Sequence, residues 1–356
     1  MISKKQFVIA LLLLSCFKLQ AQHQTEKPVK VWSAEKANTW YAGHKWINGA
    51  DYIPATAINQ LEMWQAETFD PATIDQELGW AESIGFNAMR VFLHSIAWQQ
   101  DPKGFKDRVN QYLTIANKHH IQTIFVFFDD CWNANPKAGK QPDPRPGIHN
   151  SGWMQDPGRP ITKTADFLAL KAYVDDILNT FKHDKRILLW DLYNEPGNSN
   201  KNEASAGLLT KIFTWAHAAN TDQPVSAGLW NWDFTKLNQL QLKYSDVITY
   251  HDYDTPDKHS QVIKLLKLYN RPLICTEYMA RLRNSTFENT MPMLKKENVA
   301  AINWGFVSGK TNTKYAWDTP MPDGAEPKVW FHDIFTKTGE PYKKDEIDLI
   351  KQLNNK

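Results

Sequence analysis

The chain has 356 residues, and its 41 lysines and arginines nearly balance its 39 aspartates and glutamates, for a formal net charge of +2. A near-neutral chain without long charge runs is not expected to bind nucleic acid or an anionic membrane surface. Its length suits one large α/β domain better than several small ones.

The first 21 residues have the features of a signal peptide. Two lysines near the start precede the apolar run Phe7–Leu14, and the small residue Ala21 marks the expected cleavage site. This run is too short to span a bilayer, and no later segment approaches the ~20 apolar residues that a spanning helix needs. We therefore expect a secreted or periplasmic protein with no membrane span. The alternative is a lipoprotein signal in which Cys16 is lipidated.

Beyond the signal peptide, residues 22–40 are expected to form an N-terminal leader and residues 41–356 a single domain. No change of composition and no internal repeat indicates a second domain. Cys131 and Cys275 are the only cysteines after the signal peptide. Two cysteines in so long a chain do not make a disulfide framework, and no CxxC motif indicates a metal site.

Eight short apolar, β-branched or aromatic runs alternate with helical patterns along this domain. Such alternation predicts parallel βαβ units, and eight of them predict a closed (β/α)8 TIM barrel of the α/β class. The expected strands are Trp46–Ile53, Phe86–Leu93, Thr123–Phe128, Ile187–Tyr193, Val225–Leu229, Val247–Tyr250, Leu273–Thr276 and Ala300–Phe306.

The connecting segments carry helix signals. Asp70 stands as an N-cap before Pro71, and Gly85 ends the predicted helix. Residues 105–119 and 167–181 show apolar side chains at three- and four-residue spacing, as expected for the outer helices of a barrel. The segment Lys344–Leu353 predicts a closing amphipathic helix.

One connection is unusually long. Residues 131–163, rich in proline and glycine, follow the third strand where a few residues would suffice. The segment leaves the carboxyl end of a strand, the face on which barrel enzymes carry their active sites. We expect it to form a lid or a cleft wall, the alternative being a mobile surface loop.

Polar and aromatic side chains gather where the expected strands end. A barrel with only a structural role would not need so many of them at one rim. They are Arg90 and His94, Asp129 and Asp130, Asn194 and Glu195, His251 with Asp252 and Tyr253, Glu277 and Tyr278, and Trp304.

Two of these residues form a pair. Glu195 and Glu277 lie 82 residues apart, the distance of three βα units, at the ends of strands four and seven. In a closed barrel these ends face each other across the mouth. Carboxylates about 5–5.5 Å apart suit double displacement at a glycosidic bond, in which one attacks the anomeric carbon and the other transfers protons. Most of the fifteen tryptophans and twelve tyrosines are expected in the core, and the rest can offer flat platforms to sugar rings.

The motifs resemble those of the glycoside hydrolases of clan A, and of family 5 in particular. The resemblance rests on NEP at Asn194–Pro196, the second glutamate in LICTEY at Glu277, GFNAMR at Gly85–Arg90, HDY at His251–Tyr253 and the late Trp304, five matches in order over most of the chain. It implies a retaining β-glycosidase that acts on a β-linked oligo- or polysaccharide without a cofactor or a metal.

The resemblance also implies roles for single residues. Glu195 resembles the acid/base and needs a raised pKa, whereas Glu277 resembles the nucleophile and must be ionised. Arg90 would favour that charge, and Tyr253 could hold the carboxylate by a hydrogen bond. Asn194 resembles the residue that binds the sugar 2-hydroxyl.

Two further matches concern the walls of the site. His251 is expected beside the acid/base, or else as a hydrogen-bonded rim histidine. Trp304 is expected as the floor under the attacked sugar, or else as a core residue. Alternation along a strand would point Asn194 and Glu195 to opposite sides, so the chain must bend there if both are to touch one sugar.

The sequence departs from the family pattern at the third strand. Many family members have a histidine there that binds the attacked sugar, and this chain has Asp129 and Asp130, either of which could replace that contact. The segment Trp304–Asp318, with Lys310 and Trp317, is expected to influence substrate choice.

Asn59 and Glu62, after the first strand, are expected either to meet a sugar hydroxyl or to cap a helix. The sequence does not distinguish these two roles.

Two other functions remain open. A metal-dependent barrel hydrolase could use His94, Asp129, Asp130, His251 and Asp252, although strand one lacks the usual paired ligands. A carbohydrate-binding barrel without catalysis is the other. The kind of sugar, hydrolysis or transglycosylation, cleavage within chains or from their ends, and the oligomeric state are not determined by the sequence.

Overall fold

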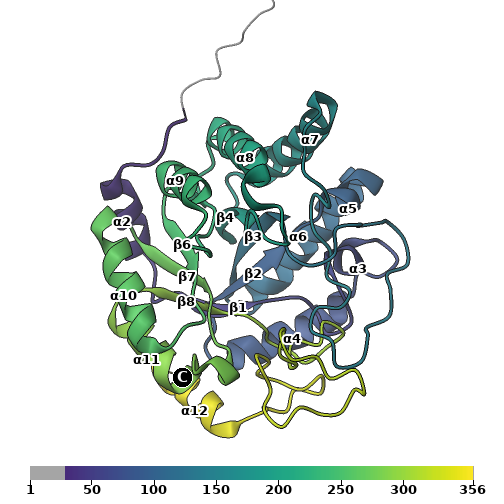
Figure 1. Cartoon of the computed structure of the whole chain (residues 1–356), viewed down its shortest axis with the longest axis vertical. Helices are drawn as coiled ribbons and strands as arrows, with labels where there is room; N and C mark the ends of the chain where they lie inside the picture. Colours follow the sequence, from purple (N-terminus) through teal and green to yellow (C-terminus); the bar gives the residue numbers. More distant parts are fainter. Residues whose placement is uncertain (1–28, 356) are drawn as a thin grey trace, which may run out of the picture.

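The computed structural model describes residues 29–355, so the expected signal peptide and Cys16 lie outside the described residues. Within this part, eight parallel strands form one sheet surrounded by helices (Figure 1), which confirms the predicted (β/α)8 barrel. The strands are β1 (Asn48–Asp51), β2 (Ala88–Phe92), β3 (Gln122–Asp129), β4 (Ile187–Asn194), β5 (Val225–Ser226), β6 (Ile248–His251), β7 (Leu273–Glu277) and β8 (Ala300–Asn303).

The sheet runs in the order β5-β4-β3-β2-β1-β8-β7-β6. Its two outer strands meet through a single parallel bridge between Leu229, three residues beyond β5, and Tyr250 in β6. Leu229 N–H donates to the carbonyl of Thr249 at 3.0 Å, and His251 N–H donates to the carbonyl of Leu229 at 2.8 Å. These bonds close the barrel.

All the expected strands are present, but several are shorter than the apolar runs that indicated them. After β8 the chain turns at Gly305, whose φ is +81°. Phe306 nevertheless stays buried. Burial therefore extends past the last ladder hydrogen bond, and an apolar pattern overestimates strand length.

The predicted helices are confirmed as well. Asp70 caps α4 by accepting from Thr73 N–H at 3.1 Å, and Pro71 begins the helix. The closing helix has the predicted bounds. The α-helices are α2 (Ala34–Ala42), α3 (Gln60–Trp64), α4 (Pro71–Ser83), α5 (Ser95–Gln100), α6 (Pro102–Lys118), α7 (Thr164–Phe181), α8 (Ala206–Ala219), α9 (Thr235–Tyr244), α10 (Pro256–Leu266), α11 (Phe287–Lys296) and α12 (Lys344–Leu353).

The described part of the chain also contains three short 3-10 helices: η1 (Asn202–Ser205), η2 (Lys267–Tyr269) and η3 (Arg281–Arg283). In residues 29–355 no helix is both long enough and apolar enough to cross a membrane.

Alternation along β2 illustrates how the barrel is filled. Met89 and Val91 point outward and join the large core between strands and helices. Ala88, Arg90 and Phe92 point inward, because successive residues of a strand face opposite sides. Ala88 belongs to the apolar floor, whereas Phe92 belongs to an aromatic cluster at the mouth. Arg90 thus lies in the middle of its strand, inside the barrel, and not at the strand end.

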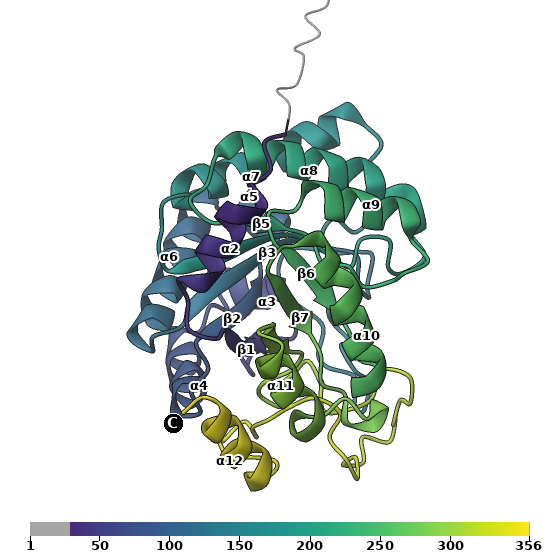
Figure 2. The same cartoon turned by 90° about the vertical axis from the view of Figure 1, so that its left-hand side faces the viewer.

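Helix α2 covers the amino-terminal end of the barrel, in front of the strands in Figure 2. Its Ala37 and Tyr41 pack against floor residues such as Leu188 and Ile302. The helix spans both sides of the boundary expected between leader and domain at residue 40.

Candidate active site

A pocket of about 760 Å³ opens at the carboxyl ends of the strands. Polar residues of β4, β6 and β7 reach its base, as the strand-end pattern predicted. Its walls are strongly aromatic, because six tryptophans line it: Trp132, Trp153, Trp230, Trp232, Trp304 and Trp317.

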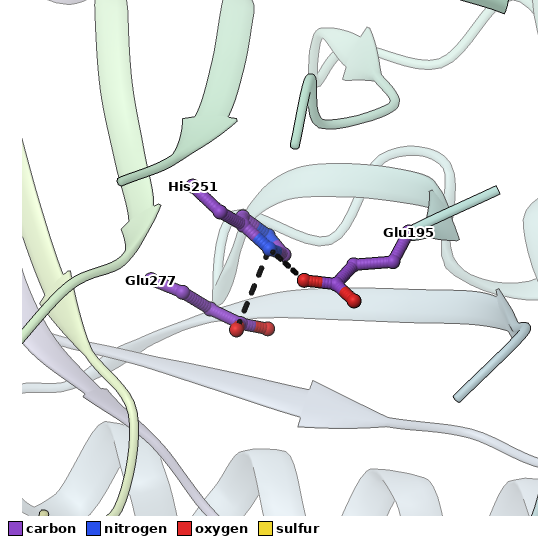
Figure 3. A group of neighbouring side chains, drawn as sticks. All are labelled: Glu195, His251 and Glu277. Carbon is purple, nitrogen blue, oxygen red and sulfur yellow. Dashed lines mark hydrogen bonds and ion pairs between the residues drawn. The ribbon is translucent and has the colours of Figure 1, made fainter. Parts of the chain in front are cut away.

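Glu195, His251 and Glu277 meet at the base of this pocket (Figure 3). The Nδ1 atom of His251 lies 2.9 Å from Oε1 of Glu195 and 3.4 Å from Oε2 of Glu277. One carboxylate oxygen of each glutamate lies within 4.8 Å of the other. This spacing is close to that of carboxylates that work by double displacement and shorter than the ~6.5–9.5 Å of an inverting pair.

A backbone bend brings Asn194 and Glu195 to the same pocket. Glu195 has a φ of +42°, a left-handed conformation that non-glycine residues rarely adopt. This bend is the one that the sequence required for both side chains to face one ligand. Strain of this kind persists only where the surroundings hold it. Here the carboxylate of Asp130 holds the following turn by accepting from Gly197 N–H at 2.7 Å and pairing with Lys201 at 2.6 Å.

The guanidinium of Arg90 organises the layer beneath the pocket. It contacts carboxylate oxygens of Asp51 at 2.7 Å, Asp191 at 2.9 Å and Glu277 at 3.0 Å. It also donates to Oδ1 of Asn194 at 2.6 Å. Arg90 is fully buried and does not line the pocket. It therefore acts on any ligand through Glu277 and Asn194.

Glu195 is surrounded by neutral donors. Burial raises the pKa of this carboxyl, and hydrogen bonds from Cys131 and Asn198 partly oppose the rise. The thiol of Cys131 lies 3.2 Å from Oε2, and the amide of Asn198 donates to the same oxygen. Burial also lowers the pKa of His251 to about 4, so its ring is neutral near pH 7. A neutral ring can donate one Nδ1–H bond to Glu195 without adding a charge.

Glu277 is buried too, but its partners favour the anion. Burial raises its pKa, His251 opposes this, and the nearby Glu195 adds to the rise. The cation of Arg90 and the hydroxyl of Tyr253, which donates to Oε2 at 2.8 Å, lower the pKa again. Burial also raises the pKa of Tyr253 well above its usual value, so the phenol remains a donor. Of the two glutamates, only Glu277 has a guanidinium within hydrogen-bonding distance.

Trp304 forms part of the pocket lining, 8 % exposed, with its ring braced from two sides. Phe92 meets it edge-on at 5.9 Å between ring centroids, and Trp153 at 5.4 Å. The ring therefore packs in an aromatic cluster and also faces the pocket, and its place under the attacked sugar stays a prediction.

Asp129 and Asp130 are buried and do not line the pocket. Asp129 accepts from the amide of Asn194 at 3.0 Å and from the indole of Trp153 at 2.7 Å. It thus positions two lining residues from behind. The residues that line the pocket just after this strand end are Cys131 and Trp132, which the sequence did not single out.

The segment after β1 has a structural role. The side chain of Asn59 caps α3 by accepting from Glu62 N–H at 2.9 Å. Glu62 pairs with Lys310 at 2.6 Å. None of these three residues lines the pocket, whereas Trp317 does.

The five residues considered as metal ligands do not converge. His94 is buried beside Asp156, and Asp129 and Asp130 face other partners. Within residues 29–355, the group whose donor atoms do come together is Glu195, His251 and Glu277. Its histidine nitrogen already bridges the two carboxylates.

Other lining residues were missed from the sequence. Trp230 and Trp232 follow strand five, and their place just beyond a strand end is the signal that could have indicated them. Asn198 stands three residues after Glu195 in the same turn. Trp153 and His149 come from the long segment 131–163, where no local pattern marks a position as pocket-facing.

Comparisons with known proteins rest on the fold alone. No family model matches the sequence, and no curated protein resembles it significantly. Among solved structures, a GH5_18 variant from Streptomyces cattleya in complex with Manβ1-4GlcNAc superposes with a TM-score of 0.59 and 10% identity, over 87% of this chain and 80% of that one.

Two other solved structures are similar in the same way. A hyperthermostable endo-1,4-β-D-mannanase from Thermotoga petrophila RKU-1 gives a TM-score of 0.55 at 13% identity, over 88% and 99% of the two chains. An exo-β-1,4-mannosidase from Opitutaceae bacterium strain TAV5 gives a TM-score of 0.59 at 14% identity, over 87% of this chain and 59% of that one.

Proposed function

We propose that this chain is a retaining β-glycoside hydrolase of the family 5 type. The observation that carries the proposal is the placement of Glu195 and Glu277 at the ends of β4 and β7, with carboxylate oxygens within 4.8 Å, at the base of an aromatic pocket. The similarity of the barrel to solved GH5_18, mannanase and mannosidase structures supports it.

In the first step, an oxygen of Glu277 attacks the anomeric carbon and forms a covalent glycosyl ester. The bond from that carbon to the leaving oxygen breaks, and Glu195 gives its proton to this oxygen. Arg90 and Tyr253 orient the attacking carboxylate. Asn194, held by Arg90 and Asp129, is placed to bond the 2-hydroxyl as charge develops on the ring.

In the second step, Glu195 has become a carboxylate and takes a proton from water. The water oxygen attacks the anomeric carbon, and the ester bond to Glu277 breaks. Configuration at the anomeric carbon is retained, because it has been inverted twice. The neutral His251 keeps its bond to Glu195 in both states.

The substrates of the solved relatives guide the choice of sugar. Their names describe action on β-mannosidic bonds or a bound Manβ1-4GlcNAc. β-Mannosides therefore come first in a substrate panel, followed by β-glucosides, β-xylosides and β-galactosides. The signal-like residues 1–21 support export to the periplasm or the medium as part of the same proposal.

The test uses two variants and azide. Glu195→Ala is expected to lower turnover about 10²–10⁴-fold, the range of a lost general acid, and Glu277→Ala to lower it further. Azide should rescue Glu277→Ala with a product of inverted configuration, because a small anion occupies the place of the missing carboxylate. In Glu195→Ala azide should yield the retained product from an activated aryl glycoside.

Near-normal turnover in either variant would rule the proposal out. Binding of oligosaccharide without turnover, unchanged in Glu277→Gln, would instead favour a carbohydrate-binding barrel. Loss of wild-type activity with a chelator, restored by a divalent ion, would favour metal chemistry.

A further inference from the structure

The pocket is closed on one side of the barrel. Its lining residues come from the segments after β3, β4, β5, β6, β7 and β8. Among the described residues, none from the segments that follow β1 and β2 lines it. Those two strands are adjacent in the sheet, so the missing sector is continuous.

Two long segments meet over this sector. They are the β3 loop (residues 130–163) and the β8 segment (residues 304–343), which lie near α3 in Figure 1. Five hydrogen bonds join them. The backbone N–H of Asn150 donates to Thr311 O at 2.8 Å, and that of Met321 to Gly147 O at 3.0 Å. His149 Nδ1 bonds Tyr315 O at 2.8 Å, and Asn312 Nδ2 donates to Arg145 O at 2.9 Å and to Ile148 O at 3.3 Å.

Both segments are also anchored to the chain after β1. Asn59 donates to the side chain of Gln141 and to the carbonyl of Gly152, each at 2.8 Å. Lys310 N–H donates to the carbonyl of Ala55 at 3.1 Å, and its ammonium pairs with Glu62. The closed side is therefore not a single overhanging loop. The β3 loop and the β8 segment are bonded to each other, and each is also bonded to the chain after β1.

The inner surface of the closed side is formed by Trp153 and Trp304, and Phe92 packs edge-on against both rings. Behind these rings remains a cavity of about 20 Å³. Such a volume holds about one water molecule, which needs ~10–15 Å³. A second sugar ring cannot extend past Trp153 and Trp304 without displacing them.

The positions of the two glutamates indicate which end of the substrate meets this side. The leaving group must lie beside Glu195, which protonates its oxygen. Glu195 ends β4, and β4 and β5 are neighbours on the half of the sheet away from β1. The attacked ring therefore extends from Glu277 towards Trp304, and its non-reducing end faces the closed side.

The opposite side has the features of an open binding path. Trp232, which follows β5, lines it and is 45% exposed. Trp230 is held there by an indole bond to the carbonyl of Pro196 at 3.0 Å. Exposed flat rings beyond Glu195 can stack on further sugar units of the leaving group.

We propose that the enzyme acts from chain ends: the pocket accepts one sugar unit at the non-reducing end of a β-linked chain and releases units one at a time. This inference rests on the proposed function, because the direction of the substrate is read from the roles of Glu195 and Glu277. The similar solved structures include both an endo- and an exo-acting enzyme. The proposal of action from chain ends therefore rests on this chain's own β3 loop and β8 segment.

The experiment compares two tetrasaccharides of the sugar that the panel identifies. One carries a bulky acetal on its non-reducing terminal ring, and the other carries an aryl group at its reducing end. We expect the second to release monosaccharide as the first product and the first to react at least 100-fold more slowly. Comparable rates, or disaccharides and longer fragments among the initial products, would overturn the inference.

A variant pair tests the closed side itself. Trp153→Gly joins the small cavity to the pocket and should raise the rate ratio of the capped to the uncapped substrate. Trp232→Gly, on the open side, should leave this ratio unchanged. An equal effect of both variants would count against the closed side as the cause.

An aryl β-monoglycoside distinguishes a failure of the inference from a failure of the proposed function. If the wild type hydrolyses it and also cuts the capped tetrasaccharide, the proposed function stands and the inference is wrong. If no aryl glycoside and neither tetrasaccharide reacts, the proposed function fails, and the inference fails with it.

Discussion

At the scale of the residue, two identical side chains differ because their neighbours differ. Glu277 receives a guanidinium and a phenol, whereas Glu195 receives an amide, a thiol and a neutral imidazole. A nearby cation favours an ionised carboxylate, and burial without one favours the protonated form. The proposed function needs such a difference, because in it Glu277 is the nucleophile and Glu195 the acid, and these roles require differently tuned carboxyls.

Asn198→Ala is expected to move the alkaline limb of the kcat/KM profile to higher pH. The Asn198 amide stabilises the ionised form of Glu195, so its loss raises the pKa of that carboxyl further. The protonated acid then persists to a higher pH. The profile should be measured with an aryl β-glycoside whose phenol is a poor leaving group and needs the proton.

Tyr253→Phe is the matched control, because it removes a donor from the other carboxylate. The pKa of Glu277 should rise, and the acidic limb should move to higher pH while the alkaline limb stays. If both variants moved the same limb, or if Asn198→Ala moved its limb to lower pH, the assignment of the two roles would be wrong.

At the scale of the element, buried carboxyls join strands to helices. Glu77 in α4 accepts from the hydroxyl of Tyr52 at 2.8 Å and from Ala55 N–H at 3.1 Å, just beyond β1. It is almost fully buried, and burial raises its pKa to about 7. The contact fixes the chain at the start of the closed side.

Glu77→Gln is expected to alter how stability depends on pH. The folded protein keeps the Glu77 proton up to about pH 7, whereas the unfolded chain releases it near its ordinary pKa of 4.5. The folded state binds more protons between these values, so the free energy of unfolding falls as pH rises, by about 3 kcal/mol from this group.

The variant should lack that fall, and its stability relative to wild type should increase from pH 4.5 to 8. Denaturant unfolding at several pH values measures this, with the exposed Glu67→Gln as the control. Parallel pH curves for Glu77→Gln and wild type would contradict the prediction.

At the scale of the whole molecule, the two ends of the barrel have separate tasks. The amino-terminal end is an apolar floor covered by α2, whereas charged groups and the pocket occupy the carboxyl end. Arg90 lies between them in the middle of β2. A change at the floor should therefore alter stability without altering the chemistry at the mouth.

Ala37→Asp places a carboxylate in the floor and should lower the free energy of unfolding by about 3–5 kcal/mol, the cost of an unpaired buried charge. Thr39→Asp, on the exposed side of α2, is the control and should change it by less than about 1 kcal/mol. Unfolding curves measure both, and kcat of the folded fraction should match wild type. Equal stability of the two variants would show that α2 does not seal the barrel.

Much of this arrangement could be predicted from local patterns. Apolar runs bounded by turn residues indicated all the strands, because burial in a parallel sheet imposes a continuous apolar pattern. Parallel strands end at one rim, so Asn194, Glu195, His251, Tyr253 and Glu277 were expected in one site, and they lie together. The bend at Glu195 also followed from period-two alternation.

The roles of Asp129, Asn59 and the long segments were decided only by the tertiary structure. Asp129 lies behind the pocket and bonds Asn194, whereas Cys131 lines the pocket. The direction in which the chain leaves β3 decides this, and no local pattern encodes that direction. The closed side depends on bonds between residues that are far apart in the sequence, such as Asn150 and Thr311. Strand ends follow from short-range periodicity, whereas the shape of the pocket depends on where two long segments meet.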